Sequence, residues 1–474
     1  MNKSAVELCL LKSMVLSIPD LKSLTEEFMH GLAKVENLTI NDCKELTSLW
    51  PNRFTSLVTL HMISCPSLVN INCLTSTLRT LKIVGCSALK SLPMSNCTCI
   101  EYATIEECNS LMFISRGQLP PTLKRLEIND CENLQFVVDE GEASSSSSPS
   151  SLLMNEESLC SNSHNYESLK YLCDLPATLK HLDIWGCSEL TSLSFRNQLP
   201  TALVSLIVWF CPKLESIANK LLNNASLEQL EIWNCENLKS LPEGLHKLCH
   251  LNKIDINRCP SVVCFPDGGL LPTSLRELSI RDCEKLEALP NGMHNLTSLQ
   301  ELCICDCQSL KSFPEDGYPS NLTSLRLKGV NIRKQVFEWG FHKLISLRYL
   351  CIYGEFLDWK SFPDKEDGET MMMLPTSLIE LRIVNFQNIV FLSSKDFQTL
   401  SSLQRLSIVN CPKLASLPEK GLPTTLVKLH IRLCPVLNQH CKKGKGQEWF
   451  KIAHIPYVEI DGKLVYELEE EEEQ

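Results

Sequence analysis

LEQLEIWNCENLKSLP, residues 227–242, is the clearest copy of a unit that recurs along the chain. The same frame, LxxLxIxxC followed by two further apolar residues, returns in LNKIDINRCPSVVCFP at 251–266 and in LRELSIRDCEKLEALP at 275–290. A fixed period of this kind is the signature of a solenoid, and this frame is that of a leucine-rich repeat. The period is 24 residues (211 to 235, for example) between successive cysteines, namely Cys187, Cys211, Cys235, Cys259, Cys283 and Cys307.

The LxIx part of each unit alternates apolar and polar residues, which is the period of a β-strand. Leu230 and Ile232 should therefore face one way, and Glu231 and Trp233 the other. One such strand cannot bury its apolar face alone, so the copies must stack in parallel around a continuous core. The sequence predicts an α/β-type solenoid, a leucine-rich-repeat horseshoe with a parallel β-sheet on the concave face and mostly irregular or 3₁₀ segments on the convex side.

Cysteine recurs just after each predicted strand, and 13 of the 25 cysteines occupy this position. There a small side chain can be buried while its S–H group donates weakly to a backbone carbonyl. Neighbouring cysteines should lie about 4.8 Å apart with parallel Cβ vectors, whereas a disulfide needs a Cβ separation of about 3.8 Å. We expect a ladder of buried free thiols. Because free thiols persist in a reducing compartment, we also expect a cytoplasmic protein, with the nucleus as an alternative.

The composition and motifs exclude several classes of function. The net charge of −11 argues against a surface for nucleic acid or an anionic membrane. The sequence has no apolar run of about 18 residues and hence no predicted membrane span. It carries no phosphate-binding loop, HExxH or GxSxG motif, so we expect neither an enzyme nor a cofactor. Cys303, Cys305 and Cys307 lack the paired spacing of zinc sites, and we expect no metal.

The predicted organisation follows the repeats. Because no capping motif precedes the first unit, we expect further sequence upstream. Asp461-Gly462 predicts a two-residue hairpin turn that covers the last sheet edge. Val330, Glu355 and Phe386 replace the ladder cysteine in three late units. The predicted segments are a degenerate repeat at 1–31, a first array at 32–138, a Ser-rich insertion at 139–168, a second array at 169–438 with a possible degenerate repeat near 169–175, a C-terminal cap at 439–466 and an acidic disordered tail at 467–474.

The outward strand positions, which would form the concave face, are the candidate binding surface. Trp185, Trp209 and Trp233 occupy the same position in three consecutive units, and Phe210 follows the second. An exposed group of aromatic residues is typical of a protein-binding site. The alternative is that the tryptophans stack on one another or lie beneath the Ser-rich insertion.

Charges on this face are sorted along the chain. The functional hypothesis is a bipolar surface that orients a protein partner by charge complementarity. The alternative is a solvated face on which this distribution arose by chance. The acidic set is Glu127, Asp130, Asp183, Glu231 and Asp255, and the later basic set is Arg326, Lys328, Arg382, Arg405, Lys428 and Arg432.

The frame SLxxLxIxxCxxLxSLP, entered through LPTSLRELSI or LPTTLVKLHI, resembles the repeat region of plant intracellular disease-resistance proteins of the coiled-coil, nucleotide-binding class. The ending CPVLNQHCKKGKGQEWFKIAHIPYVEIDGK at 434–463 is similar to the terminus of that class. The LxGxIP element of extracellular plant receptors is absent.

The resemblance implies a sensor that recognises a pathogen effector, or a host protein altered by one, and that contributes to autoinhibition of a nucleotide-binding switch domain. That switch is not among these 474 residues. The alternative is a substrate-recognition subunit of a ubiquitin ligase. An F-box-like helical segment would favour that alternative, and the sequence contains none.

Overall fold

A computed structural model describes most of the chain between residues 11 and 466. The residues that it does not describe are 1–10, 26–27, 29–31, 51–53, 73, 93, 95–96, 117–118, 135, 140–174, 192, 194–198, 219, 222–225, 267–268, 311–316, 330–342, 356, 364, 367–368, 371–373 and 467–474. Residues 1–10 of the predicted degenerate repeat lie outside the described part, and so do the Ser-rich insertion apart from Asp139, Val330 and the acidic tail.

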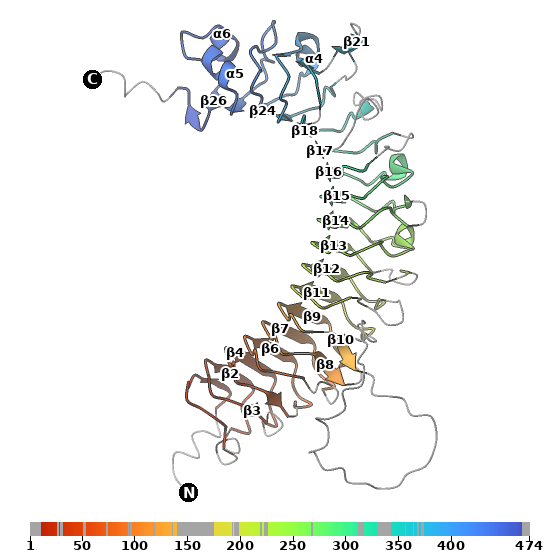
Figure 1. Cartoon of the computed structure of the whole chain (residues 1–474), viewed down its shortest axis with the longest axis vertical. Helices are drawn as coiled ribbons and strands as arrows, with labels where there is room; N and C mark the ends of the chain where they lie inside the picture. The colour runs from red at the N-terminus through yellow and green to blue at the C-terminus, as the bar shows by residue number, and fades with distance from the viewer. Residues whose placement is uncertain are drawn as a thin grey trace, which may run out of the picture. The chain divides into compact units, whose positions relative to one another are not determined.

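The chain forms two compact units, each a stack of short turns with one β-strand per repeat (Figure 1). The first unit comprises residues 1–227 and 234–243, and the second comprises 228–233 and 244–474. In the first unit, consecutive strands pair in parallel, so that Leu182 aligns with Leu206 and Ile184 with Val208. Its strands are β1 (Ser13–Leu16), β2 (Asn37–Asn41), β4 (Thr59–Ile63), β6 (Thr80–Val84), β7 (Tyr102–Glu106), β9 (Arg125–Asn129), β11 (His181–Trp185) and β12 (Ser205–Trp209).

The second unit continues the same pattern of parallel pairing, which confirms the predicted parallel-sheet solenoid. Its strands are β13 (Gln229–Trp233), β14 (Lys253–Asn257), β15 (Glu277–Arg281), β16 (Glu301–Cys305), β17 (Ser324–Lys328), β18 (Tyr349–Tyr353), β22 (Glu380–Val384), β24 (Arg405–Val409), β25 (Lys428–Arg432), β26 (Tyr457–Ile460) and β27 (Lys463–Leu464).

The core consists of the inward strand residues and the predicted cysteine ladder. Leu230 and Ile232 are fully buried, as their alternation with polar residues requires. All 13 ladder cysteines are fully buried and free, which confirms the prediction of a thiol ladder. The thiol of Cys131, for example, donates to the carbonyl of Asn129 two residues back, at 3.4 Å, and lies 3.9 Å from that of Ile105 in the previous repeat.

The residue before the ladder cysteine adopts a left-handed backbone conformation, which the sequence analysis missed. Asp130, for example, has φ of 50° and Asn234 has φ of 54°. Asparagine, aspartate and glycine tolerate this conformation best, and their recurrence at this position was the available signal. The residues of this column with positive φ are Asp42, Ser64, Gly85, Glu107, Asp130, Gly186, Phe210, Asn234, Arg258, Asp282, Asp306, Gly329, Asn385, Asn410, Leu433 and Asp461.

Hydroxyl groups connect successive repeats at the entry to the strand. The residue just before the first leucine of the frame is often Thr or Ser, and its side chain donates to a carbonyl of the previous repeat. These hydrogen bonds give the LPTSL and LPTTL segments a structural role. The bonds run from Thr77 to Leu57, Thr122 to Ile100, Thr178 to Leu123, Ser274 to Leu251, Ser377 to Leu347 and Thr425 to Leu403, at 2.8–2.9 Å.

Strand β9 pairs directly with β11, so the segment between them adds no strand to the sheet. The register is unbroken, with Leu126 opposite Leu182 and Ile128 opposite Ile184. Thr178 strengthens this junction by donating to the carbonyl of Leu123 across the insertion. The degenerate repeat expected near 169–175 falls almost wholly outside the described residues.

The side of the repeats opposite the strands is mostly irregular among the described residues, as predicted. It contains the 3₁₀ turns η2 (Leu245–Lys247) and η4 (Met293–Asn295) and one short helix, α4 (Ser394–Thr399). Short extended pieces also pair there or in neighbouring loops. The pairs are β3 (Ser48–Leu49) with β5 (Asn70–Ile71), β8 (Phe113–Arg116) with β10 (Phe136–Asp139), β19 (Ser361–Phe362) with β23 (Phe391–Leu392), and β20 (Lys365–Glu366) with β21 (Glu369–Thr370).

Aromatic residues pack together at the position where phenylalanine replaces the ladder cysteine. Phe386 is fully buried, and its ring centroid lies 5.8 Å from that of Trp359 and 5.4 Å from that of Phe362. The ring reaches so close to Gly354 that a Cβ there would lie 2.2 Å from it. The ring of Phe386 therefore fits only because residue 354 is a glycine, which has no Cβ.

The segment from β26 to β27 covers strand β25 at the end of the repeats. Strand β26 pairs in parallel with β25 and turns back through Asp461 and Gly462 into the antiparallel β27, which confirms the predicted hairpin. Helices α5 (Pro435–His440) and α6 (Trp449–Ile452) precede it. A buried ion pair joins Lys451 to Glu448 at 2.8 Å, and Glu448 accepts the backbone N–H of Leu417.

Candidate protein-binding surface

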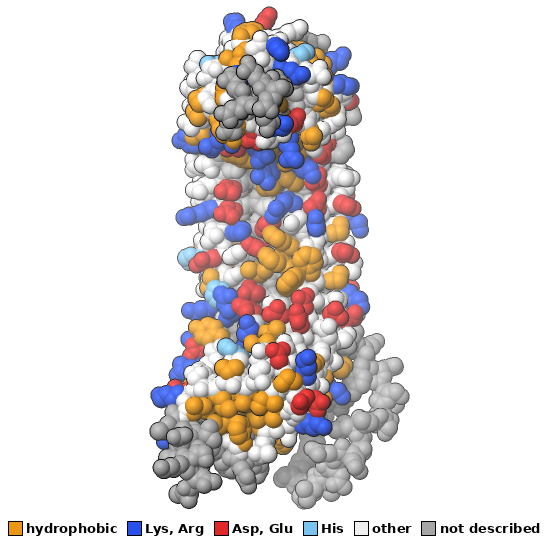
Figure 2. All heavy atoms as spheres, turned by 90° about the vertical axis from the view of Figure 1, so that its left-hand side faces the viewer, with side chains coloured by type: hydrophobic (Ala, Val, Ile, Leu, Met, Phe, Trp, Pro, Cys, Tyr) orange, Lys and Arg blue, Asp and Glu red, His pale blue; other side chains and the backbone are white. Residues whose placement is uncertain are grey.

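The outward face of each sheet consists of the first, third and fifth residues of every strand, which alternate with the buried positions. These side chains contribute little to the core, so their chemistry is free to serve recognition. Figure 2 shows this face, with patches of hydrophobic side chains among acidic and basic ones.

The first unit carries an exposed aromatic group at its last two strands. Trp185 is 42% exposed and Phe210 is 45% exposed, and their ring centroids are 6.1 Å apart at 57°. Trp209 aligns with Trp185 in the sheet and is half-buried. Two large rings at this exposure form an apolar surface of the kind that protein partners cover.

Phe210 is held in a backbone conformation that its side chain disfavours. It lies in the left-handed column with φ of 55°, where a bulky residue is a clear outlier. Such a residue costs of order 1–3 kcal/mol and is found most often at functional sites. Because the side chain is also 45% exposed, burial of its ring offsets only part of this cost.

In the second unit, Trp233 is half-buried beneath a cation. The guanidinium of Arg281 lies 5.6 Å from the centre of its ring. The same guanidinium donates to Asp255 at 2.7 Å, so the tryptophan, the arginine and the carboxylate form one cluster. Cation–π contacts of this kind fix the orientation of both side chains.

The predicted acidic contacts Glu231 and Asp255 are buried, each only 5% exposed. Glu231 pairs with Lys253 at 2.7 Å, as Asp255 does with Arg281. The expectation that they present negative charge to a partner is therefore corrected, since desolvated carboxylates are retained only when a cation neutralises them. Asp183 is partly buried, 3.5 Å from Arg125.

The predicted basic residues lie on later strands of the second unit, where Figure 2 shows blue side chains toward the C-terminal end. Lys328 pairs with Asp306 at 2.7 Å and Arg405 with Glu380 at 2.6 Å, so their charges are largely compensated. Arg326 and Arg382 flank the buried Cys351 on adjacent strands.

These two arginines have no carboxylate partner among the described residues. Arg326 donates to the hydroxyl of Tyr349 at 3.3 Å, and Nε of Arg382 is buried without a hydrogen-bond acceptor in the described part of the chain. An arginine whose charge is not compensated within the described chain fits a carboxylate supplied by another molecule.

Comparison with known proteins finds plant relatives for two stretches of the chain. No family model matches the chain. A stretch of 148 residues, 31% of the chain, is 36% identical to the Arabidopsis thaliana disease resistance protein At3g14460. A stretch of 112 residues, 22% of the chain, is 31% identical to disease resistance RPP13-like protein 1 of the same plant. The matches span 10% and 11% of the length of these relatives.

A solved structure confirms the fold independently. The leucine-rich-repeat protein LIC12759 of Leptospira interrogans superposes with a TM-score of 0.51 at 18% identity, covering 97% of both chains. The chain is a leucine-rich-repeat array, and the two matched stretches are similar to parts of plant disease resistance proteins. In solenoid folds generally, the stacked repeats form an extended surface that such proteins use for binding.

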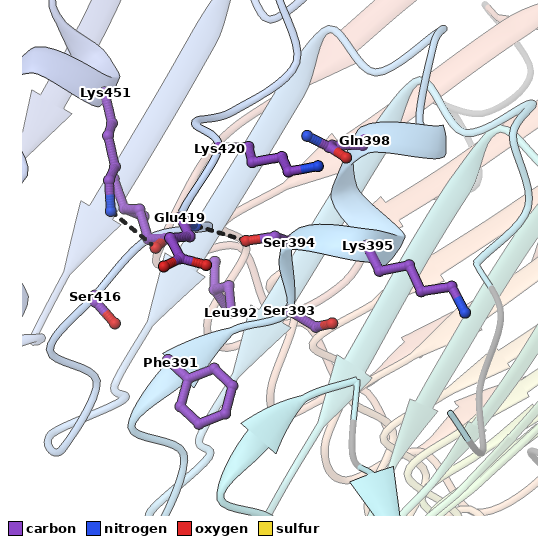
Figure 3. Close-up of a pocket in the computed structure, with 11 residues that line it drawn as sticks. Phe391, Leu392, Ser393, Ser394, Lys395, Gln398, Ser416, Glu419, Lys420 and Lys451 are labelled. Atoms are coloured by element: carbon purple, nitrogen blue, oxygen red, sulfur yellow. Dashed lines mark hydrogen bonds between the residues drawn. The ribbon is translucent and has the colours of Figure 1, made fainter. Parts of the chain in front are cut away.

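The array also contains a hollow of about 560 Å³ beside α4, which sequence reasoning did not find. Its lining residues come from 391–398, from 416–420 and from α6 (Figure 3). The buried cation there, Lys451, is neutralised by Glu448 and bonded to the carbonyl of Leu417. Through these contacts Lys451 joins α6 to the loop that contains Leu417, which indicates a structural role for the lysine.

Within the described residues of the array, none of the helices has the length and apolar character needed to cross a membrane.

Proposed function

We propose that the array is the sensor region of a cytoplasmic plant immune receptor. Its outward face binds a pathogen effector, or a host protein that an effector has altered, and contributes to holding a nucleotide-binding switch inactive. The relatives support this proposal through their description as disease resistance proteins. Because the matches span only a tenth of those relatives, the activity of the whole receptor is part of the proposal.

The observation that carries the binding role is Phe210. A fold that needed only stability would place asparagine or glycine at this left-handed position. An exposed aromatic ring that costs stability, beside the exposed Trp185, is better explained by a partner that covers both.

The face of the second unit supports a complementary contact. Arg326 and Arg382 offer guanidinium groups without carboxylate partners in the described chain. An acidic segment of the partner would satisfy them, while the aromatic group would supply an apolar anchor. We therefore expect a partner surface that combines apolar and acidic residues.

The test is affinity capture on the full chain, with leaf extract from healthy and infected plants and quantitative mass spectrometry. Replacing Trp185, Trp209 and Trp233 together by alanine should reduce a specifically captured protein at least about tenfold, since each hot-spot ring contributes of order 1–2 kcal/mol or more. The thermal unfolding midpoint serves to check that the variant is folded.

The matched control replaces Val263 and Leu270, exposed apolar residues outside the strands, by alanine. Equal loss of capture in this control, or unchanged capture in the tryptophan variant, would remove the outward face from consideration. Capture of ubiquitin-ligase subunits that is insensitive to the tryptophan variant would support the ligase alternative instead.

A further inference from the structure

Two cysteines on β16 lie outside the buried ladder and face outward together. Cys303 and Cys305 are the third and fifth residues of the strand, and their Sγ atoms are 3.6 Å apart. Cys303 is half-buried, whereas Cys305 is only 6% exposed. The Cys303 thiol is thus partly exposed to solvent, and the neighbouring Cys305 thiol is nearly buried.

The neighbouring strands surround this pair with polar and positive side chains. Ser279 and Arg281 of β15 lie opposite Cys303 and Cys305 on one side, and Arg326 and Lys328 of β17 lie opposite them on the other. Positive charge on the adjacent strands favours the thiolate form of a cysteine over the thiol.

Carboxylates near the pair do not cancel this effect fully. Arg281 is paired with Asp255 and Lys328 with Asp306, but Arg326 has only the hydroxyl of Tyr349 among the described residues. The hollow of about 260 Å³ that contains Cys303 is also lined by Lys253 and by the carboxylates of Asp255, Glu277 and Glu301.

Together, the nearby cations and hydrogen-bond donors lower the pKa of Cys303. Its hydrogen bond from Cys305 is the main cause, and Arg326 and Arg281 add to it, so that the pKa falls to about 7 in spite of burial. Burial acts the other way where such partners are missing: it raises the pKa of Cys441, near the C-terminal cap, to about 12.

We propose that Cys303 and Cys305 form a thiol oxidation site on the outward face, which reacts with hydroperoxides. The Cys303 thiolate attacks one peroxide oxygen, the O–O bond breaks, and the other oxygen leaves as hydroxide, which gives a sulfenic acid at Cys303. The Cys305 thiol then attacks the sulfenic sulfur, water leaves, and an S–S bond forms. Peroxide is reduced by two electrons, and the two thiols are oxidised by two.

The strand geometry makes the product reversible. Residues two apart on a strand have Cα atoms about 6.6–6.8 Å apart, which is the upper end of the range that a disulfide spans. The disulfide at Cys303 and Cys305 would therefore be strained, and strained disulfides are readily reduced by cellular thiols. The site suits a reversible modification within a binding surface.

The first test measures alkylation by iodoacetamide across pH on the folded full chain, resolved by peptide mass spectrometry. Cys249 and Cys264 are exposed and serve as internal controls. We expect Cys303 to react roughly tenfold faster than either at pH 7. Its rate should rise with pH to half its maximum near pH 7. Both Arg326→Gln and Cys305→Ser should slow it at pH 7.

The second test treats the reduced chain with hydrogen peroxide. We expect the peptide that contains Cys303 and Cys305 to lose two hydrogen atoms, and dithiothreitol to restore it. In the Cys305→Ser variant, a sulfenic acid should accumulate at Cys303 and be trapped by dimedone. The proposal is overturned if Cys303 alkylates no faster than Cys249, or if peroxide leaves this peptide unchanged. Circular dichroism checks that each variant is folded.

Discussion

At the scale of single residues, the left-handed column separates what the fold needs from what it tolerates. Most repeats place Asp, Asn or Gly before the ladder cysteine, whereas Phe210 and Leu433 are bulky and exposed there. Both residues strain the backbone, but Phe210 alone of the two has an aromatic neighbour at the candidate surface. Stability and recognition therefore make opposite demands at this position.

The substitution Phe210→Asn should stabilise the chain and weaken partner binding. Relief of left-handed strain contributes of order 1–3 kcal/mol, and loss of the ring contact with Trp185 removes about 0.5–1.5 kcal/mol. We expect a net gain of about 1 kcal/mol, measured by urea unfolding. Leu433→Asn is the control and should stabilise the chain without affecting capture. Lower stability in Phe210→Asn would contradict the assignment of strain.

At the scale of elements, the repeats are held together by contacts that recur once per turn and by local substitutes where the pattern changes. Several ladder thiols, such as that of Cys131, lie near a carbonyl of the previous repeat, and the Thr or Ser hydroxyls donate to a carbonyl of that repeat. Where Phe386 replaces cysteine, the glycine at 354 creates the room for its ring. The effect of a substitution at residue 354 should therefore depend on which residue occupies position 386, and the reverse.

The Gly354→Ala substitution should destabilise the second unit, because its methyl group would lie 2.2 Å from the ring of Phe386. Overpacking of this kind typically costs about 1–3 kcal/mol. Adding Phe386→Cys, which restores the ladder residue, should remove most of that additional penalty in a double-mutant cycle. Additive effects in the cycle, measured by chemical unfolding, would show that the two positions are not coupled.

The C-terminal cap should depend on its buried ion pair. Lys451→Met leaves the carboxylate of Glu448 buried without its cation, and breaking a buried pair in this way costs about 3–5 kcal/mol. We expect faster amide hydrogen exchange in β26 and α6 than in the wild type. The double substitution Lys451→Met with Glu448→Gln should recover part of the loss. Unchanged exchange in Lys451→Met would indicate that the cap is held by its apolar contacts alone.

At the scale of the whole chain, the periodic pattern was sufficient to predict the architecture. The LxIx alternation and the fixed spacing of cysteine predict the parallel strands, their register and the thiol ladder, because all follow from local spacing. Partners from different repeats cannot be deduced in this way. The burial of Glu231 and Asp255 depends on Lys253 and Arg281, which lie one repeat further on in each case.

The candidate surface could be predicted in outline only. The outward positions of Trp185, Arg326 and Arg382 followed from alternation, and their places on the sheet agree. The strain at Phe210 required the backbone angles of its column. The closeness of Cys303 and Cys305 required side-chain rotamers, because residues two apart on a strand do not normally bring their sulfur atoms to 3.6 Å.

Ionic strength should separate the two parts of the proposed interface. Contacts to Arg326 and Arg382 are electrostatic and weaken as salt screens them, whereas aromatic contacts do not. For a partner captured in the test above, the dissociation constant should rise with salt, and the double variant Arg326→Gln with Arg382→Gln should flatten that dependence. The matched variant Lys395→Gln with Lys420→Gln, beside α4, should keep the wild-type slope. A salt-independent affinity in the wild type would argue against the basic contact.

The direct pairing of β9 with β11 has a practical consequence. The two strands meet in register, and Thr178 secures their junction although the chain leaves and returns between them. The entropic cost of closing a loop grows only slowly with its length. A fluorescent reporter or an affinity tag grafted within 145–150 should therefore be carried without disturbing the repeats, which makes this segment a suitable place to label the protein.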